Sequence, residues 1–125
     1  MPFNFEKFTH VDTSYSARVT IRQTGQIGFN GGAINRFFRP DQTHCVLYFD
    51  PIERVVGIEL VSGLCDGAIE IKRGDTNTYI RSKNFCDRYG IDYRKPHRFA
   101  LQLDQETGFL YFKLVDELAK ETDGE

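Results

Sequence analysis

The sequence predicts one mainly β domain of the α+β class, a pseudo-twofold barrel or sandwich made of two related ββαββ units. Short apolar runs alternate with polar residues at period two and are separated by turn residues, which is typical of half-buried strands. A pattern of roughly fifty residues occurs twice, over residues 17–60 and 68–114. One copy alone would bury too little apolar surface to offset chain entropy, so we expect both copies to fold together.

The repeat is clearest in the second part of each unit. Residues 46–60 (VLYFDPIERVVGIEL) align with residues 100–114 (ALQLDQETGFLYFKL) at an offset of 54. Both segments predict a hairpin whose turn begins at Asp50 or Asp104. Upstream the offset is 51, and the difference falls in the loop 92–96, where a length change costs little.

The first copy starts with a strand at residues 17–21, where apolar and polar residues alternate. Gly25 turns the chain, and a second short strand follows at 27–29. Asn30 is placed to cap a helix that extends to about residue 38, because its side chain can accept from the first turn. Pro40 then prevents the helix from continuing.

The second copy repeats this order after a connector at residues 62–67. Alternation predicts a strand around 69–71 and a short strand at 78–80. Ser82 is expected to cap the helix, and Gly90 to stop it.

The two ends lie outside the repeat. Residues 1–15 contain several phenylalanines and are expected to form an aromatic arm packed on the outside. Residues 115–125 form an acidic tail, whose first residues, 115–120, are expected to add a short helix.

Composition limits the function classes. The chain has 125 residues, so we expect a single domain over 1–125. Its net charge is -2, which excludes a strongly basic nucleic-acid binder and requires any polyanion site to be local. We expect neither export nor membrane spanning, because the sequence has no run of eighteen apolar residues and residues 1–10 lack a basic segment followed by an apolar stretch. Three widely spaced cysteines, Cys45, Cys65 and Cys86, favour a reducing cytoplasm over a disulfide framework.

Residues 20–60 (TIRQTGQIGFN…AINRFF…D…CVLYFD…VVGIEL) resemble the AbrB/MazE-like swapped-hairpin proteins, and residues 68–114 resemble them more loosely. Such proteins close one barrel from two chains, so two tandem units look like that dimer in one polypeptide, as in MraZ-type regulators. The resemblance implies a swapped-hairpin barrel that binds double-stranded DNA as a transcription regulator or antitoxin, as a monomeric pseudo-dimer or a homodimer. This sequence departs from the family pattern at Gln26, Asn30, Ile34 and Arg81, where a basic residue, a proline, an arginine and a proline are usual.

The distribution of positive charge supplies the candidate site. Between residues 70 and 98 eight Lys or Arg face four acids, and the first copy adds arginines on its first strand and around its helix. Spaced cations suit phosphates, and arginine can also bind a guanine edge. The offset of 51 makes Arg22 and Arg73 equivalent, so a twofold face could present both. The candidate nucleic-acid-binding residues are Arg18, Arg22, Arg36, Arg39, Lys72, Arg73, Arg81, Lys83 and Arg88.

Other interpretations remain open. The cations could be an ordinary solvated strand face, and aromatics beside them, as at residues 36–39, could pack in the core or stack unpaired bases. A non-catalytic protein-interaction module that uses the aromatic arm and binds no nucleic acid is the competing class. We expect no cofactor, no metal and no catalytic residues. The glycines at 25–32 match no phosphate-binding motif, and no His or Cys pair has zinc-site spacing.

Overall fold

The computed structural model describes residues 3–5, 16–74 and 77–118. The elements in this part of the chain are β1 (Arg18–Ile21), β2 (Gln26–Phe29), α1 (Gly31–Phe37), β3 (His44–Asp50), β4 (Val55–Val61), β5 (Ala68–Glu70), β6 (Lys72–Arg73), β7 (Thr78–Arg81), α2 (Lys83–Tyr89), β8 (His97–Ala100), β9 (Gln102–Leu103) and β10 (Leu110–Lys113). The first half has the order β-β-α-β-β. The second half has the same order if β5 with β6, and β8 with β9, are each taken as one interrupted strand.

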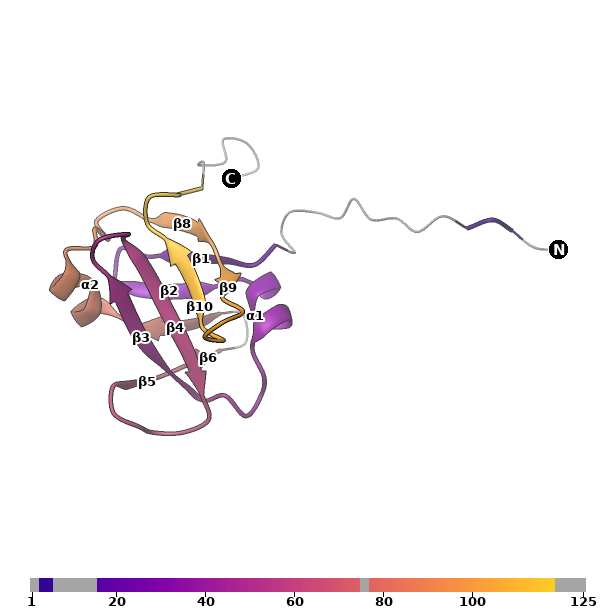
Figure 1. Cartoon of the computed structure of the whole chain (residues 1–125), viewed down its shortest axis with the longest axis horizontal. Helices are drawn as coiled ribbons and strands as arrows, with labels where there is room; N and C mark the ends of the chain where they lie inside the picture. The colour runs from indigo at the N-terminus through magenta and orange to yellow at the C-terminus, as the bar shows by residue number, and fades with distance from the viewer. Residues whose placement is uncertain (1–2, 6–15, 75–76, 119–125) are drawn as a thin grey trace.

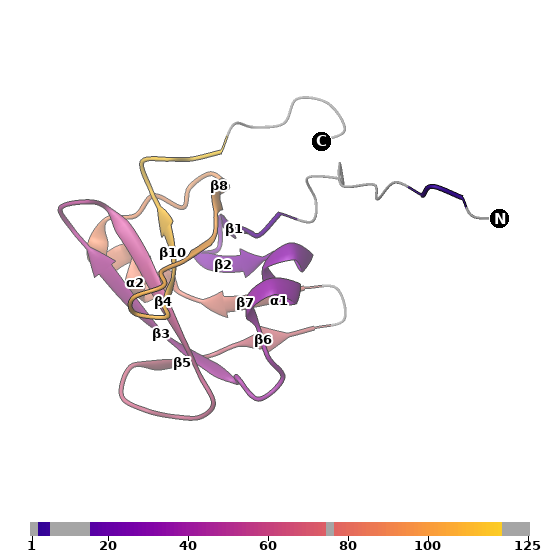
Figure 2. The same cartoon turned by 45° about the vertical axis from the view of Figure 1, so that its right-hand side comes forward.

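The strands form two antiparallel sheets (Figures 1 and 2). Sheet A has the order β6-β7-β2-β1-β8, and sheet B has the order β5-β3-β4-β10-β9. The prediction of a mainly β domain is therefore confirmed. The hydrogen-bonded pairs give two separate five-stranded sheets and not one closed barrel, so the layered alternative describes the observed pairing.

Two strands pass from one sheet to the other. β5 pairs with β3 in sheet B, while β6, which follows after Ile71, pairs with β7 in sheet A. Likewise β8 pairs with β1, and β9, which follows after Leu101, pairs with β10. Ile71 and Leu101 are both buried, so each corner between the sheets is fixed by an apolar residue in the core.

In both sheets, a residue of one half of the chain pairs with the equivalent residue of the other half. Gly28 pairs with Tyr79 at the centre of sheet A, and the offset of 51 relates these same two residues. Gly57 pairs with Tyr111 at the centre of sheet B, and the offset of 54 relates them. Where a residue pairs with its own counterpart, a twofold axis passes between the two residues. A pseudo-twofold axis therefore passes through both sheets.

The two hairpin turns of sheet B also match. The amide of Arg54 donates to the carbonyl of Asp50, and the amide of Gly108 donates to the carbonyl of Asp104, both at 2.8 Å. Arg54 has a φ of 59° and Gly108 a φ of 78°, a left-handed conformation that favours glycine. The first copy therefore places an arginine where the second copy has the better-suited residue.

The helices lie at opposite ends of the sandwich in both views (Figures 1 and 2). Asn30 caps α1 as predicted, since its side chain accepts a hydrogen bond from the amide of Ala33 at 2.9 Å. Gly90 ends α2 in the left-handed conformation, also as predicted. Ser82 stands at the N-terminus of α2 but makes no capping bond. Its hydroxyl donates instead to the carbonyl of Gly25 at 2.7 Å.

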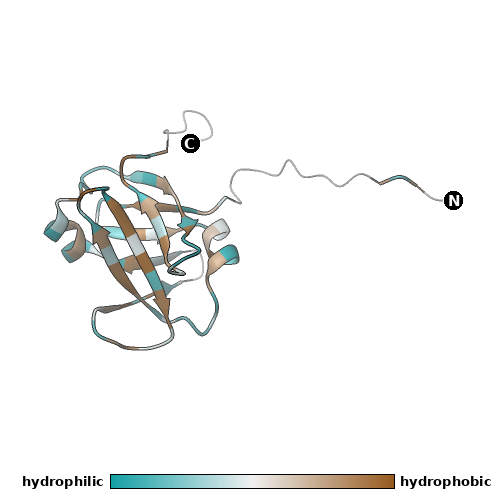
Figure 3. Cartoon of the chain, in the orientation of Figure 1, coloured by the Kyte–Doolittle hydropathy of each residue, from teal (hydrophilic) through white to brown (hydrophobic). Residues whose placement is uncertain are grey.

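The core lies between the sheets and is apolar throughout its centre. Sheet A contributes Val19, Ile21 and Ile80, and sheet B contributes Ile58 and Phe112, all at most 1% exposed. Figure 3 shows the apolar residues concentrated along the strands and the polar residues on loops and helix surfaces. The outer faces of the two sheets consequently point in opposite directions.

The ends differ from expectation where they are described. Phe3 and Phe5 are 76% and 89% exposed, and their ring centroids are 5.6 Å apart. The expected packing of the arm on the domain is therefore not seen at these positions, and most of the arm lies outside the described residues. Residues 115–118 form a turn and a single bridge between Phe99 and Glu117, so no helix begins there.

Candidate functional site

The outer face of sheet A carries a row of cross-strand neighbours that spans all five strands. Alternation buries Val19 and Ile21 and turns Thr20 outward, and the pairing extends from Thr20 to both edges of the sheet. The row is Arg98, Thr20, Gly28, Tyr79 and Lys72.

Arg22 covers the centre of this row. Its guanidinium lies directly on Gly28, where a Cβ atom would overlap it, and is 5.9 Å from the centre of the Tyr79 ring. Nη2 donates to Oδ1 of Asn77 at 2.7 Å, and Nη1 donates to Oε1 of Gln26 at 3.5 Å. Because Gly28 has no side chain, the Arg22 guanidinium can lie over the backbone near the pseudo-twofold axis.

Further cations flank the row on the same face. Arg18 precedes Thr20 by two residues on β1, and Arg81 follows Tyr79 by two residues on β7, so both point outward with the row. We call the set Arg18, Arg22, Lys72, Arg81 and Arg98 the basic face. The five strands of sheet A, as bounded above, contain no aspartate or glutamate.

One acid, Glu70, sits at the edge of the basic face. Glu70, in β5, lies 2.9 Å from Nζ of Lys72, and this hydrogen bond lowers the pKa of the Glu70 carboxyl. Both groups are solvent-exposed in part, so the pair contributes little to folding and can open at small cost. Lys72 is therefore able to exchange this partner for another anion.

The other predicted residues lie away from the basic face. Arg36 lies in the last turn of α1, and Arg39 follows the helix with a side chain 72% exposed and 3.7 Å from Asp41. Arg88 lies on α2 with its guanidinium 5.9 Å from the Tyr89 ring. These three residues lie on or next to the helices at the ends of the sandwich.

Lys83 and Arg73 are engaged by neighbouring groups. Nζ of Lys83 is 3.2 Å from Asp87 and lies over the ring of Tyr93. The hydrogen bond to Asp87 raises the pKa of Lys83, and hydrogen bonds from the Tyr93 hydroxyl and from Lys83 lower the pKa of Asp87. Nη2 of Arg73 donates to the carbonyls of Arg39 at 3.1 Å and Gln42 at 2.6 Å. Arg73 therefore ties β6 to the chain that follows α1.

The proposed equivalence of Arg22 and Arg73 is wrong. In the pairing of β5 with β3, Glu70 takes the position that Thr20 has in the pairing of β1 with β8. In the pairing of β6 with β7, Lys72 takes the position that Thr20 has in the pairing of β1 with β2. The interrupted strand β5–β6 thus has two residues more than β1 around Ile71, and this shifts Arg73 off the outer face. A constant sequence offset cannot reveal such a local insertion.

Sequence reasoning nominated Arg18, Arg22, Lys72 and Arg81, which the fold brings together, but it passed over Arg98. Arg98 directly precedes Phe99, an apolar residue aligned with Cys45 in the first copy, so alternation places it on the solvent side. That signal was present in the sequence. Its proximity to β1 could come only from the pairing of β8 with β1.

The described residues contain no group of three or more His, Cys, Asp or Glu that could hold a metal ion. Cys45 and Cys86 are buried thiols, and burial raises the pKa of Cys45 to about 12, which suits a core residue. No helix among the described residues is long and apolar enough to cross a membrane.

A scan against protein-family models finds no model that matches the chain, and searches of curated proteins and of solved structures return no match.

Proposed function

We propose that this chain binds double-stranded DNA through the basic face of sheet A. The observation that carries the proposal is the segregation of charge: five cations share one sheet face whose strands contain no acid, although the whole chain is slightly acidic. Phosphate contacts by spaced cations supply most of the affinity of such a surface.

The dimensions of the face suit a duplex. The row from Arg98 to Lys72 crosses four strand spacings, which is roughly 19 Å. The major groove of B-DNA is about 12 Å wide, so a row of this length reaches phosphates on both sides of the groove. Arg22 lies between the two ends, near the centre of the row, and adds a further cation to the surface that the phosphates would meet.

The plan of the fold supports the same class. Each half contributes its first hairpin, β1–β2 or β6–β7, to sheet A, and its last strands to sheet B. Each half also lends a strand to the other, since β1 pairs with β8 and β3 pairs with β5. We propose that the chain is a single-polypeptide version of the swapped-hairpin plan, with its first hairpins forming a DNA-binding surface as in transcription regulators.

The experiment is a titration of a fluorescent duplex with the full chain, followed by anisotropy at several salt concentrations. The variant Arg22→Gln/Arg81→Gln should bind at least about tenfold more weakly and lower the salt slope by about two, because two phosphate contacts are lost. The matched control, Arg36→Gln/Arg39→Gln, removes the same charge away from sheet A and should bind as the wild type does. Equal losses in both variants, or no binding by the wild type at low salt, would reject the proposal.

A second candidate, a protein-interaction module, is favoured by the arm. Phe3 and Phe5 offer two large aromatic rings that are 76% and 89% exposed. Deletion of residues 1–12 should abolish capture of a protein partner under this hypothesis and leave DNA affinity unchanged. If the deletion weakens DNA binding instead, the arm belongs to the nucleic-acid site.

A further inference from the structure

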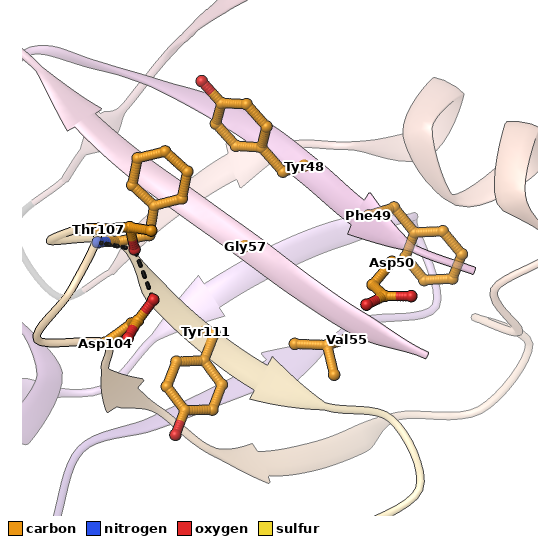
Figure 4. Close-up of a pocket in the computed structure, with 9 residues that line it drawn as sticks. Tyr48, Phe49, Asp50, Val55, Gly57, Asp104, Thr107 and Tyr111 are labelled. Carbon is orange, nitrogen blue, oxygen red and sulfur yellow. Dashed lines mark hydrogen bonds between the residues drawn. The ribbon is translucent and has the colours of Figure 1, made fainter. Parts of the chain in front are cut away.

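The outer face of sheet B, opposite the basic face, contains a hollow of about 440 Å³. Its walls are mostly aromatic, its floor includes Gly57, and two carboxylates contribute to its lining. Figure 4 shows Tyr48 and Tyr111 on either side of Gly57, with Asp50 and Asp104 toward opposite ends. The lining residues are Tyr48, Phe49, Asp50, Val55, Gly57, Asp104, Thr107, Phe109 and Tyr111.

The aromatic walls are held in place. Tyr48 stacks on Phe109 with ring centroids 4.7 Å apart and an angle of 22° between the planes. Its hydroxyl donates to Glu59 at 2.7 Å, which raises the pKa of Tyr48, and the hydroxyl of Tyr111 donates to Gln102 at 3.2 Å. Tyr48 remains 42% exposed, so part of the aromatic wall is open to a ligand, and hydrogen bonding to a carboxylate strengthens the attraction of its ring for a cation.

The carboxylates are fixed by the hairpin turns. Oδ1 of Asp50 accepts from the amides of Ile52 and Glu53 at 2.9 and 3.0 Å. Oδ2 of Asp104 accepts from the hydroxyl of Thr107 at 2.7 Å, which lowers the pKa of Asp104. Each carboxylate can accept further bonds, because an ionised carboxylate has about four acceptor sites.

The charge of the hollow favours a cation. Its lining includes two aspartates and no Lys, Arg or His. Arg54, beside Val55, donates to the carbonyl of Tyr89 and holds its guanidinium 5.3 Å from the centre of the Phe49 ring, while Lys113 borders the hollow as the cross-strand neighbour of Val55. Negative lining also excludes a DNA phosphate from this face, so the occupant differs from the ligand of the basic face.

We propose that this hollow binds an extended peptide segment that bears two basic side chains, with the aliphatic part of one against the aromatic walls. Ring faces attract guanidinium and ammonium groups, and carboxylates pair with them through charge-assisted hydrogen bonds. The combination favours an organic cation, whereas an apolar ligand would remove water from both carboxylates without bringing a positive charge to them.

The spacing of the carboxylates defines the peptide. Asp50 is the cross-strand neighbour of Val55 on β4. Asp104 lies opposite Phe109, which in turn lies opposite Glu59 on β4. The two positions are therefore four residues apart along the strands and three strand spacings across, which is roughly 20 Å. An extended peptide covers this distance in about six residues, so basic residues separated by about that number reach both ends.

The test is calorimetric titration of the full chain at low salt with a synthetic Ser/Gly peptide that has two arginines six positions apart. We expect binding that is lost with the same peptide carrying glutamines, and at least tenfold weaker binding by free arginine amide. If arginine amide binds as tightly as the peptide, or if the glutamine peptide binds equally well, the proposal is overturned.

Variants test the site itself. Asp50→Asn/Asp104→Asn keeps an acceptor oxygen for each turn and should weaken binding at least tenfold. The control Asp66→Asn/Asp116→Asn removes the same charge at two exposed positions outside the hollow and should bind normally. Phe109→Leu should weaken binding, and Lys113→Ala should strengthen it by removing a bordering cation. Equal effects of the two aspartate pairs, or weaker binding by Lys113→Ala, would show that the hollow is not the site.

Discussion

Gly28 offers a way to move Arg22 without changing the charge of the protein. The three atoms nearest to a Cβ added at Gly28 all belong to the Arg22 guanidinium, with Nε at 2.8 Å. These atoms are at the end of a flexible side chain, and the φ of Gly28 is not in the left-handed region. The variant Gly28→Ala should therefore fold normally and displace the guanidinium from the centre of the basic face.

The effect on stability should be small. Removing a glycine from a strand restricts the unfolded chain and stabilises the protein by roughly 0.4–1 kcal/mol. Displacing Arg22 loses its bond to Asn77, an exposed charged hydrogen bond at 2.7 Å. Such a bond contributes on the order of 1 kcal/mol. The two changes are opposite in sign, so the free energy of unfolding should stay within about 1 kcal/mol of the wild type.

The effect on DNA binding follows from the number of phosphate contacts. If each of the five cations of the basic face makes one contact, affinity should fall about 500-fold between 50 and 200 mM salt, because the slope is about -0.9 per phosphate. Loss of the Arg22 contact leaves four, which reduces the fall to about 150-fold. Fluorescence anisotropy across this salt range measures the difference.

A double-mutant cycle makes the test specific. If Gly28→Ala acts through Arg22, then Arg22→Gln should have no further effect on the salt slope in the Gly28→Ala background. Additive losses would mean that Gly28 contributes independently of Arg22. An unchanged slope in Gly28→Ala, alongside a reduced slope in Arg22→Gln, would refute the idea that the guanidinium must sit on the twofold axis.

Three further predictions concern stability. Arg73→Gln should lower the free energy of unfolding in urea by about 2 kcal/mol and leave the DNA salt slope unchanged, because Arg73 donates to the carbonyls of Arg39 and Gln42 at 3.1 and 2.6 Å. Gly108→Ala should cost about 1 kcal/mol by the same assay, since nothing lies within 4 Å of the added Cβ and only the φ of 78° opposes it. Hydrogen bonds from Arg94 lower the pKa of Asp92 to about 2, so Asp92→Asn should flatten the loss of thermal stability in acid.

The sign of the acid effect is determined by the direction of the shift. A carboxyl with a lowered pKa in the folded state stabilises the protein above its unfolded pKa of about 3.9, and this contribution is lost as the pH falls toward 2. Melting temperatures of wild type and variant should therefore converge over that window. Parallel curves would contradict the role of Asp92, and a salt slope changed by Arg73→Gln would place that residue in the DNA site after all.

The turns and caps show what local sequence could predict. Asn30 marks the start of α1 and Gly90 the end of α2, as expected, because a capping side chain and a left-handed glycine act through atoms within a few residues. Ser82 did not cap, because its ψ of 21° lies outside the extended region typical of a capping residue, and its hydroxyl is turned to the carbonyl of Gly25 in the other half of the chain. Nothing near Ser82 in the sequence indicates that contact.

For the candidate site too, local sequence predicted some features and only the strand pairing revealed the others. Alternation around Val19 and Phe99 determined which cations face solvent, a local property of any strand with one buried face. The extra residues at Ile71, which turned Arg73 toward two carbonyls, became visible only in the pairing of β5 with β3 and of β6 with β7. The aromatic hollow was not predicted at all, because Tyr48 and Phe109 are 61 residues apart and meet only across β4.

The sequence by itself determined the mainly β class, the two hairpin turns at Asp50 and Asp104, and the buried side of strands such as β1 and β8. Each of these depends on the chemistry of neighbouring residues. Only the tertiary structure decided that Gly28 meets Tyr79 and that Gly57 meets Tyr111, because hydrogen bonds between strands join segments whose distance in the chain carries no local signal. Those two pairings place the cations on one face of the sandwich and the aromatic hollow on the other.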